Sequence, residues 1–217
     1  GIHVLGIDPA ENIAKVANQK GINTLCDFFG EDLAKKLVQA NTQADVIHAN
    51  NVMAHVPDIN GFIKGLKMLL KEDGKIIIEV PHFLELVKHF EFDTVYHEHV
   101  YYFSLKALQK AFERHALCIY DVERIAMHGG SLRLFVAHKN NREISPIIQD
   151  ILNEEEAFRL HDSAIYPPFM KKIALLKQDL IAILEKLKGK KIAAYGAAAK
   201  GTTLLNYYNV GSEYLQF

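Results

Sequence analysis

The chain of 217 residues is 49% hydrophobic, which is enough apolar material to bury a sizeable core. Its 25 Lys and Arg residues nearly balance its 26 Asp and Glu residues, so the formal net charge is only −1. A balanced charge creates no global field that would attract nucleic acid or an anionic membrane. We therefore expect neither a nucleic-acid partner nor a membrane partner, and any anionic ligand must be held locally.

Cysteine spacing and hydropathy exclude further classes of protein. Cys26 and Cys118 lie far apart without CxxC spacing, so neither a zinc knuckle nor a disulfide framework is predicted. Charged residues interrupt the apolar runs before the ~18 residues of a membrane span, and no basic leader precedes an apolar segment. These features are typical of a cytoplasmic protein. Because the chain begins at Gly1 on an apolar run and without Met, we expect residues upstream.

Strands and helices are predicted to alternate in the first part of the chain. Residues 1–8 form an apolar run that ends in an acid, which is typical of an interior strand of an α/β sheet. A second short strand and loop is predicted at residues 22–29, further strands at residues 44–49 and 75–80, and helices at residues 9–21, 33–38, 59–70 and 104–115. Residues 72–74 are predicted to form a turn into the fourth strand. The alternation predicts a mostly parallel sheet with helices on both faces.

Two further strands are predicted close together, at residues 117–125 and 131–138. Only a short segment containing Gly129-Gly130 separates them, and Gly-Gly is a turn dipeptide. Such a close pair predicts an antiparallel edge to the sheet.

The pattern changes after residue 139. Residues 145–187 have a helical, polar-rich pattern that is broken only at Pro167-Pro168. Residues 190–205 then predict a strand, a small-residue turn and the start of a helix, a geometry that presents backbone N–H groups to a phosphate. We expect a core at residues 1–139, a helical connector at 140–189 and the beginning of a C-terminal α/β domain at 190–217. The last unit holds roughly one βα repeat, so we expect it to be incomplete.

Polar residues follow three predicted strands at their carboxyl ends. Asp8, Asp27 and the pair Asn50-Asn51 occupy these positions. Parallel sheets bind nucleoside ligands at this edge, where an acid can accept both ribose hydroxyls. Asp8 could equally cap the helix that starts at Pro9. The glycine-rich turn that normally marks a cofactor site is absent from the sequence.

Residues 92–104 contain the densest group of titratable side chains, including Tyr96, His97, Glu98 and His99. A metal site is one interpretation, but two His at i and i+2 point the same way only on a strand, and HxxxH spacing is lacking. Acid–base chemistry is the favoured interpretation. A histidine oriented by a carboxylate and a tyrosine hydroxyl can remove a proton from the carbon next to a ketone.

Two other segments are candidates for the same edge. His55 follows the third predicted strand on a loop, where a lone histidine is either solvated or part of a site. Ser131 and Arg133 follow Gly129-Gly130, which is either a simple turn between strands or a flexible support for a clamp. In the second case Arg133 would hold a phosphate or a substrate oxygen.

Five segments in order resemble the sugar C-methyltransferases, which add a methyl group to C3 of a nucleotide-linked 4-keto-deoxysugar. They are GIDP at 6–9, ANNVMAH at 49–55, YHEHV at 96–100, HGGSLR at 128–133 and AYGAAAKGTTLLN at 194–206. The resemblance covers nearly the whole chain, and its Tyr-His-Glu-His segment is the most specific. It implies an α/β fold with a Rossmann-like methyltransferase sheet, a helical connector and a C-terminal α/β domain.

The resemblance also implies a zinc-binding module with four cysteines before the core, and this chain lacks that module. The chain also lacks the first core strand and its glycine-rich turn. The implied cofactor is S-adenosylmethionine. No metal site is expected within these residues.

The resemblance implies a role for particular residues. His99 matches the proposed general base, Glu98 and Tyr96 match its partners, and His55 matches a second histidine near the sugar. For the cofactor, Asp8 matches the acid on the ribose, Asp27 and Phe28 fall at the adenine pocket, and Asn50 and Asn51 complete the set. For the nucleotide-linked keto-sugar, the expected residues are Arg133, Ser131, Gly196, Lys200, Thr202 and Asn206.

The expected mechanism begins with removal of the C3 proton by His99, because the C4 ketone makes that proton acidic. Tyr96 or His55 then stabilises the enolate oxygen, and the enolate attacks the sulfonium methyl group. Two alternatives remain open. One is an O- or N-methyltransferase of a small metabolite, and the other is a non-catalytic domain that binds a nucleotide sugar.

Overall fold

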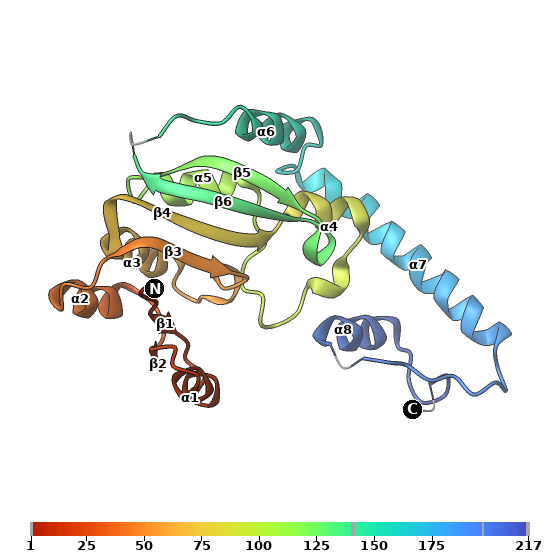
Figure 1. Cartoon of the computed structure of the whole chain (residues 1–217). Helices are drawn as coiled ribbons and strands as arrows, with labels where there is room; N and C mark the ends of the chain where they lie inside the picture. Colours follow the sequence, from red (N-terminus) through yellow and green to blue (C-terminus); the bar gives the residue numbers. More distant parts are fainter. Residues whose placement is uncertain (1, 140–141, 197, 216–217) are drawn as a thin grey trace.

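The computed structural model describes residues 2–139, 142–196 and 198–215 (Figure 1). Its main sheet has the strand order β3-β4-β6-β5, with β3 and β4 parallel and the other neighbours antiparallel. The strands are β3 (Ala44–Asn50), β4 (Leu70–Pro81), β5 (Leu117–Ile125) and β6 (Ser131–His138). A separate parallel pair joins β1 (Gly6–Ile7) to β2 (Thr24–Leu25).

Eight α-helices and four short 3₁₀ helices connect these strands in the described residues. The α-helices are α1 (Glu11–Gln19), α2 (Glu31–Gln39), α3 (Ile59–Leu69), α4 (Phe83–His89), α5 (Leu105–Glu113), α6 (Ile147–Ala157), α7 (Tyr166–Lys186) and α8 (Ala199–Tyr208). The 3₁₀ helices are η1 (Met53–His55), η2 (Phe92–Thr94), η3 (Met127–Gly129) and η4 (Ser163–Ile165).

The main core forms between the four-stranded sheet and helices α3, α5 and α6. On β4 the alternate residues Ile76, Ile78 and Val80 are fully buried, as expected for one face of a strand. Their register partners on β6 are also buried apolar residues, Val136, Leu134 and Leu132. Each such side chain contributes about 1.5–3 kcal/mol through removal from water. Two neighbouring strands therefore form the rigid centre of the molecule.

The antiparallel edge is confirmed, because β5 and β6 pair across the turn that contains Gly129 and Gly130. Both glycines have positive φ angles, 85° and 135°, which side-chain-bearing residues rarely adopt. At Gly129 a Cβ atom would also collide with the Glu91 carboxylate, and at Gly130 with the Glu85 side chain. This turn packs tightly against α4 and the residues that follow it.

Several predicted boundaries are wrong. The first two strands cover only residues 6–7 and 24–25 of the predicted ranges, and they form their own small sheet. Residues 72–74 lie within β4 as an irregularity of the β3–β4 ladder, where the register shifts between Ala44 and Val46. The extra residues are accommodated as a bulge between the pair Ala44–Leu70 and the continuous ladder that starts at Val46–Lys75.

The segment at residues 190–196 contains no strand in the described part of the chain, contrary to prediction. Most of this segment is exposed, and no neighbouring strand offers it the backbone partners that a strand needs. Gly1 of the first predicted strand and Ala197 of the predicted small-residue turn lie outside the described residues. The predicted helix start that follows is confirmed as α8.

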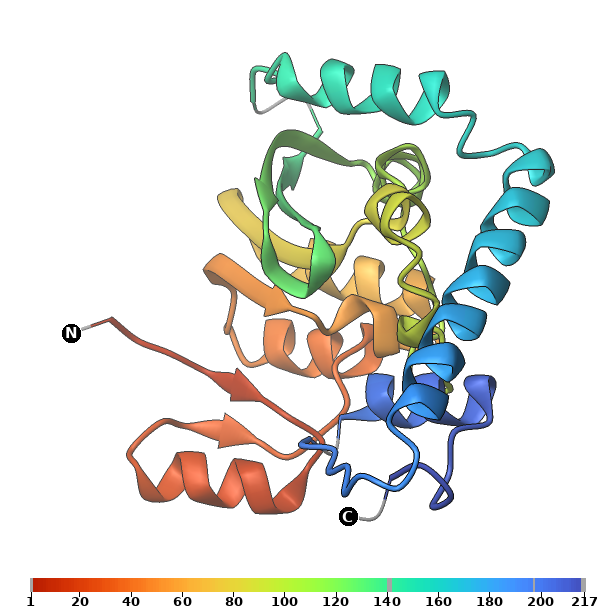
Figure 2. The ribbon, with the colours of Figure 1, turned by 90° about the vertical axis from the view of Figure 1, so that its right-hand side faces the viewer.

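The helical connector begins on the core and ends away from it. Helix α6 buries Ile148 and Ile151 in the main core, so it packs as part of that layer. Pro167-Pro168 was predicted to break the helical pattern, but these residues lie in the first turn of α7, where proline is tolerated. Figure 2 shows α7 descending beside the core toward the C-terminal residues. There α8 packs against α7 and against residues 90–92 through a second apolar cluster.

Candidate functional site

Two segments that follow neighbouring parallel strands meet at the carboxyl edge of the sheet. Helix η1 comes directly after β3, and the segment with Tyr96 and His99 comes after β4 and α4. The N–H of Val100 donates to the carbonyl of Ala54 at 2.9 Å, which joins the two segments. As a result, the rings of His55 and His99 lie with their centroids 4.9 Å apart. The structure therefore brings together the two histidines predicted for the site.

The His99 ring is held by two hydrogen bonds. Its Nδ1 atom lies 2.9 Å from the carbonyl oxygen of Thr94, and its Nε2 atom lies 3.2 Å from the hydroxyl of Tyr96. A carbonyl oxygen can only accept, so Nδ1 carries the proton. Nε2 of the neutral ring is then unprotonated and accepts from Tyr96. This tautomer leaves a basic nitrogen that is turned toward a tyrosine hydroxyl.

Burial and nearby charges keep the His99 ring neutral. Burial is the main cause that lowers the pKa of His99 below the ordinary histidine value. The bond to Thr94 opposes this shift, while the charges of His55 and Lys200 reinforce it. Burial also raises the pKa of the Tyr96 hydroxyl, with a smaller contribution from Glu98. At neutral pH the pair is thus a neutral imidazole and a neutral phenol.

Glu98 does not hold the ring as predicted. Among the described residues no hydrogen bond joins Glu98 to His99, and the Glu98 side chain is exposed. The backbone carbonyl of Thr94 takes the orienting position that was expected for a carboxylate. Glu98 acts on His99 only through its charge.

The residues predicted to hold the cofactor follow β1, β2 and β3. Asp8 accepts a hydrogen bond from the N–H of Ala10 at 2.8 Å, so one carboxylate oxygen supports the start of α1. Asp27 is exposed beside Phe28, whose side chain is 78% exposed. Asn50 ends β3 and is exposed, and Asn51 follows it with a positive φ of 53°. Carboxylates, amides and an accessible aromatic ring form a donor and acceptor set that fits a nucleoside.

Arg133 and Ser131, the predicted substrate clamp on β6, both hydrogen-bond to other residues of the chain. Arg133 donates to the buried carboxylate of Glu79 at 2.7 Å and to Glu123 at 2.8 Å. The hydroxyl of Ser131 donates to the carbonyl of Met127 at 2.9 Å, and Ser131 is buried. Arg133 therefore links β6 to β4 and β5, while Ser131 bonds the turn that precedes β6. The predicted role of both side chains toward a substrate remains a prediction.

The C-terminal helix brings a positive charge to the site. Lys200 lies in the first turn of α8, close enough that its charge adds to the lowering of the His99 pKa. Burial raises the pKa of the half-buried Glu91, and the Lys200 charge opposes that rise. Helix α8 is held there by Phe92, whose ring centroid lies 5.1 Å from those of Tyr207 and Tyr208. Gly196, Thr202 and Asn206 are the other predicted residues of this unit, and all three are exposed.

Two contributors to the site were missed by sequence reasoning. The carbonyl of Thr94 has no signal in a sequence, because every residue carries a carbonyl group. Tyr102 lies with its ring centroid 6.1 Å from that of His99. It was visible as one of several aromatic residues in the segment, but its contact with His99 depends on the tertiary fold.

The described residues contain no group of three or more His, Cys, Asp or Glu side chains that could hold a metal ion. In the same part of the chain, no helix is long and apolar enough to cross a membrane.

Two solved structures share the fold of this chain. A protein from Pyrococcus horikoshii is 14% identical, with a TM-score of 0.50 over 64% of this chain and 73% of that one. A chain from the complex between the Haloferax volcanii Trm112 methyltransferase activator and a methyltransferase is 13% identical, with a TM-score of 0.50 over 64% of this chain and 74% of that one. At such identities the likeness concerns the fold alone, which is the α/β Rossmann-like methyltransferase fold.

Sequence comparisons narrow the class to a family. Residues 1–119 match the methyltransferase domain family, and residues 126–217 match the C-methyltransferase C-terminal domain. The C-methyltransferase NovU of Streptomyces niveus is 33% identical over the whole chain. The chain spans 52% of the length of that relative. The match to the methyltransferase domain family covers more than half of the chain and shows that the chain belongs to that family.

Proposed function

We propose that this chain carries the catalytic residues of an enzyme that methylates C3 of a nucleotide-linked 4-keto-deoxysugar. The observation that carries the proposal is the orientation of His99, with Nδ1 on the Thr94 carbonyl and Nε2 on the Tyr96 hydroxyl. An imidazole fixed in this way is suited to remove a proton from carbon next to a ketone. The similarity to a C-methyltransferase supports the same chemistry.

In this mechanism Tyr96 and His55 act on the oxygen that gains charge. When the C3–H bond of the sugar faces Nε2 of His99, the Tyr96 hydroxyl turns from that nitrogen to the C4 oxygen. His99 takes the proton, and the hydroxyl donates to the enolate oxygen. The exposed His55 ring, 4.9 Å from His99 between centroids, can donate to the same oxygen. Proton removal by a placed base contributes about 10²–10⁴-fold, and hydrogen bonds to the enolate add to it.

The polar residues at the strand ends would hold S-adenosylmethionine, which when bound supplies an electrophilic methyl group. Asp8 would accept from the ribose hydroxyls with the carboxylate oxygen that does not bond Ala10. Phe28 offers an exposed ring for the adenine, and Asp27 lies beside it. Asn50 and Asn51 come at the end of β3, just before the segment that carries His55.

Lys200 would hold the phosphates of the sugar nucleotide at the start of α8. Because a lost cation–phosphate contact of this kind weakens binding by about 1.4 kcal/mol, we expect Lys200→Ala to raise the KM for the sugar nucleotide about tenfold. Steady-state kinetics would measure it. Lys191→Ala, at an exposed position before α8, is the matched control and should leave KM unchanged. Equal KM values for the two variants would remove Lys200 from the binding site.

The pH dependence of the reaction should follow the lowered pKa of His99. A base must be neutral to act, so kcat/KM should rise with pH through the pKa of His99 and then level off. The midpoint is expected below the ordinary histidine value of about 6.5. Lys200→Ala removes a charge that lowers this pKa, so the midpoint should move upward in that variant. A pH–rate profile with no acid limb would contradict a histidine base.

The proposal is tested by locating the transferred methyl group. We expect the full-length protein, incubated with S-adenosylmethionine labelled at the methyl carbon and a nucleoside-diphosphate 4-keto-deoxysugar, to form a product labelled on the carbon next to the ketone. Carbon NMR distinguishes that carbon from oxygen or nitrogen. Label on a heteroatom would overturn the proposal.

A further inference from the structure

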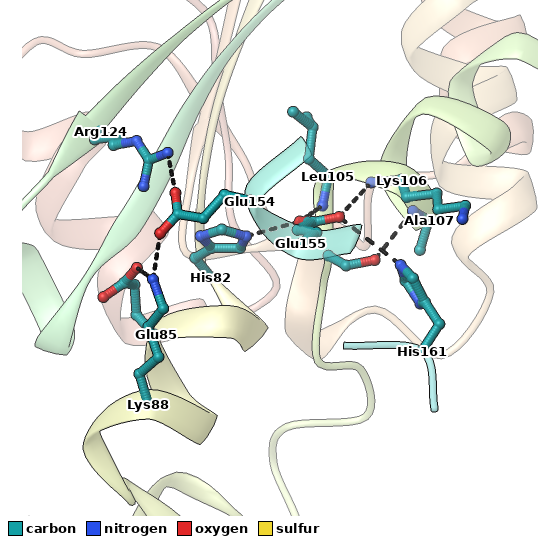
Figure 3. Close-up of polar contacts among 11 residues, drawn as sticks. His82, Glu85, Lys88, Leu105, Lys106, Ala107, Arg124, Glu154, Glu155 and His161 are labelled. Carbon is teal, nitrogen blue, oxygen red and sulfur yellow. Dashed lines mark hydrogen bonds and ion pairs between the residues drawn. The ribbon is translucent and has the colours of Figure 1, made fainter. Parts of the chain in front are cut away.

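A buried carboxylate on α6 lies outside the residues assigned to the reaction. The Glu155 side chain is 1% exposed, and its oxygens accept hydrogen bonds from three donors on the core (Figure 3). The Nε2 atom of His82 lies at 2.8 Å, the N–H of Leu105 at 2.5 Å and the N–H of Lys106 at 3.2 Å. A buried carboxylate is costly unless it is saturated with donors, and this one is.

The donors belong to two different elements. Leu105 and Lys106 are the first residues of α5, where free N–H groups and the helix dipole favour a negative charge. His82 directly precedes α4 and is itself 2% exposed. The adjacent Glu154 bonds Lys88 of α4 and Arg124 of β5 (Figure 3). The last turn of α6 therefore fastens α4, α5 and β5 together.

The residues that Glu155 joins flank one segment, residues 83–104, because His82 precedes it and Leu105 and Lys106 follow it. The backbone also closes there, because His82 and Phe103 form a bridge and the N–H of Phe83 donates to the Phe103 carbonyl at 2.8 Å. Between these ends the segment carries Thr94, Tyr96 and His99. The Glu155 carboxylate thus holds the chain both where this segment begins and where it ends.

A line of contacts leads from this closure to the His99 ring. Leu84 and Val87 of α4 form a buried cluster, against which Tyr102 packs. The Tyr102 ring in turn lies edge-on to His99, with centroids 6.1 Å apart. A shift of α4 relative to α5 would move Tyr102 and the carbonyl of Thr94 together, and both define the place of the His99 ring.

We propose that Glu155 is a positioning residue for His99, which closes the segment 83–104 through His82 on one side and the start of α5 on the other. The role in catalysis rests on the function proposed above. The claim that Glu155 fixes the position of the His99 ring does not rest on that function, because it concerns the ring alone.

The test is Glu155→Gln in the full-length protein. The amide has nearly the same shape, but its NH₂ group faces donors where the carboxylate offered an acceptor, so at least one of the three donors loses its partner. Glu156→Gln is the matched control, since Glu156 is on the same turn, 75% exposed, and bonds only the Lys106 ammonium among the described contacts.

The first measurement is the pH titration of the His99 ring by ¹⁵N NMR, with the signal assigned by its absence from His99→Gln. We expect the wild type and Glu156→Gln to show the Nδ1–H form with a lowered pKa. In Glu155→Gln the pKa should move toward the ordinary histidine value, and both tautomers should be populated. The second measurement is kinetic: kcat should fall about 10–100-fold while the KM for S-adenosylmethionine changes less than about twofold, as expected for a displaced base.

Variants at His82 keep the test decisive if Glu155→Gln does not fold. His82→Gln retains a donor for the carboxylate and should behave like the wild type, whereas His82→Leu removes it and should shift the His99 titration. The proposal is overturned if folded Glu155→Gln or His82→Leu shows the wild-type titration and tautomer of His99. If His99→Gln retains full methyl transfer, the proposed function fails, but the titration still decides the positioning role.

Discussion

Replacing His99 with glutamine is expected to reduce methyl transfer about 10²–10⁴-fold, the contribution of a placed general base. Glutamine keeps a polar side chain of similar length but has no basic nitrogen to receive the C3 proton. Binding of S-adenosylmethionine should not change, because its predicted contacts lie at the ends of β1, β2 and β3 or just after them. Initial rates and calorimetry on the full-length protein measure the two effects separately.

His97→Gln is the matched control for this prediction. His97 lies two residues away in the turn before His99, is exposed, and makes no side-chain hydrogen bond or ring contact among the described residues. Its substitution should leave the rate within about twofold of the wild type. If the two variants retained equal rates, His99 would not be the base.

Replacing Glu155 with alanine is expected to lower the free energy of unfolding by about 3–5 kcal/mol, because each buried donor that loses its acceptor costs about 1–3 kcal/mol. The substitution leaves the N–H groups of Leu105 and Lys106 and the buried ring of His82 without their acceptor. It also opens a cavity between α6 and the core. Urea unfolding followed by circular dichroism provides the measurement.

Glu156→Ala supplies the control for stability. Its exposed pair with Lys106 is expected to contribute no more than about 1 kcal/mol. Equal stability losses in the two variants would mean that the Glu155 contacts contribute nothing beyond an ordinary surface pair.

The effect of Glu155 on stability should depend on pH. Burial raises the pKa of Glu155, but the bonds from His82, Leu105 and Lys106 outweigh burial, and the pKa is lowered. A carboxylate with a lowered folded-state pKa contributes stability above its unfolded pKa, which is about 4.3. That contribution is lost as the pH falls through the folded-state pKa. The stability difference between wild type and Glu155→Ala should therefore shrink in acid, and a difference that grows in acid would contradict the assignment.

Those elements with a strong local pattern were predictable. The buried run in β4, the period of α3 and the close pair β5 and β6 all follow from apolar spacing, which tertiary contacts here reinforce. The first two strands were too long in the prediction, because a strand's length is set by its neighbours and each of these has one partner in the described residues. The strand expected at residues 190–196 is absent for a similar reason.

Parts of the candidate site were predictable from chemistry. His55, Tyr96 and His99 were named because their residue types suit proton removal, and the fold brings them together. Sequence reasoning could not identify the Thr94 carbonyl as the orienting group. Glu155 was also hidden, because it stands in a run of three acids that reads as a solvated face of a polar helix. Only the docking of α6 on the core reveals its role.

Arg133 shows a contact that sequence reasoning did not find. Beside a glycine pair, a guanidinium suggested a clamp for a substrate oxygen. In the fold Glu79 is the direct register partner of Arg133 on β4, and its buried carboxylate forms an ion pair with the guanidinium. Cross-strand partners of this kind depend on register, which the sequence does not specify for strands so far apart.

The central claim is that His99 generates an enolate next to the sugar ketone, and solvent exchange tests it most directly. The full-length protein is incubated in D₂O with the nucleoside-diphosphate 4-keto-deoxysugar, with and without S-adenosylmethionine, and the sugar is examined by NMR. We predict that the wild type exchanges the C3 proton for deuterium and that His99→Gln does so at least about 100-fold more slowly. Two results together would contradict the account. The first is that the wild type transfers the methyl group when S-adenosylmethionine is present but puts no deuterium at C3 when it is absent. The second is that His99→Gln transfers the methyl group at the wild-type rate.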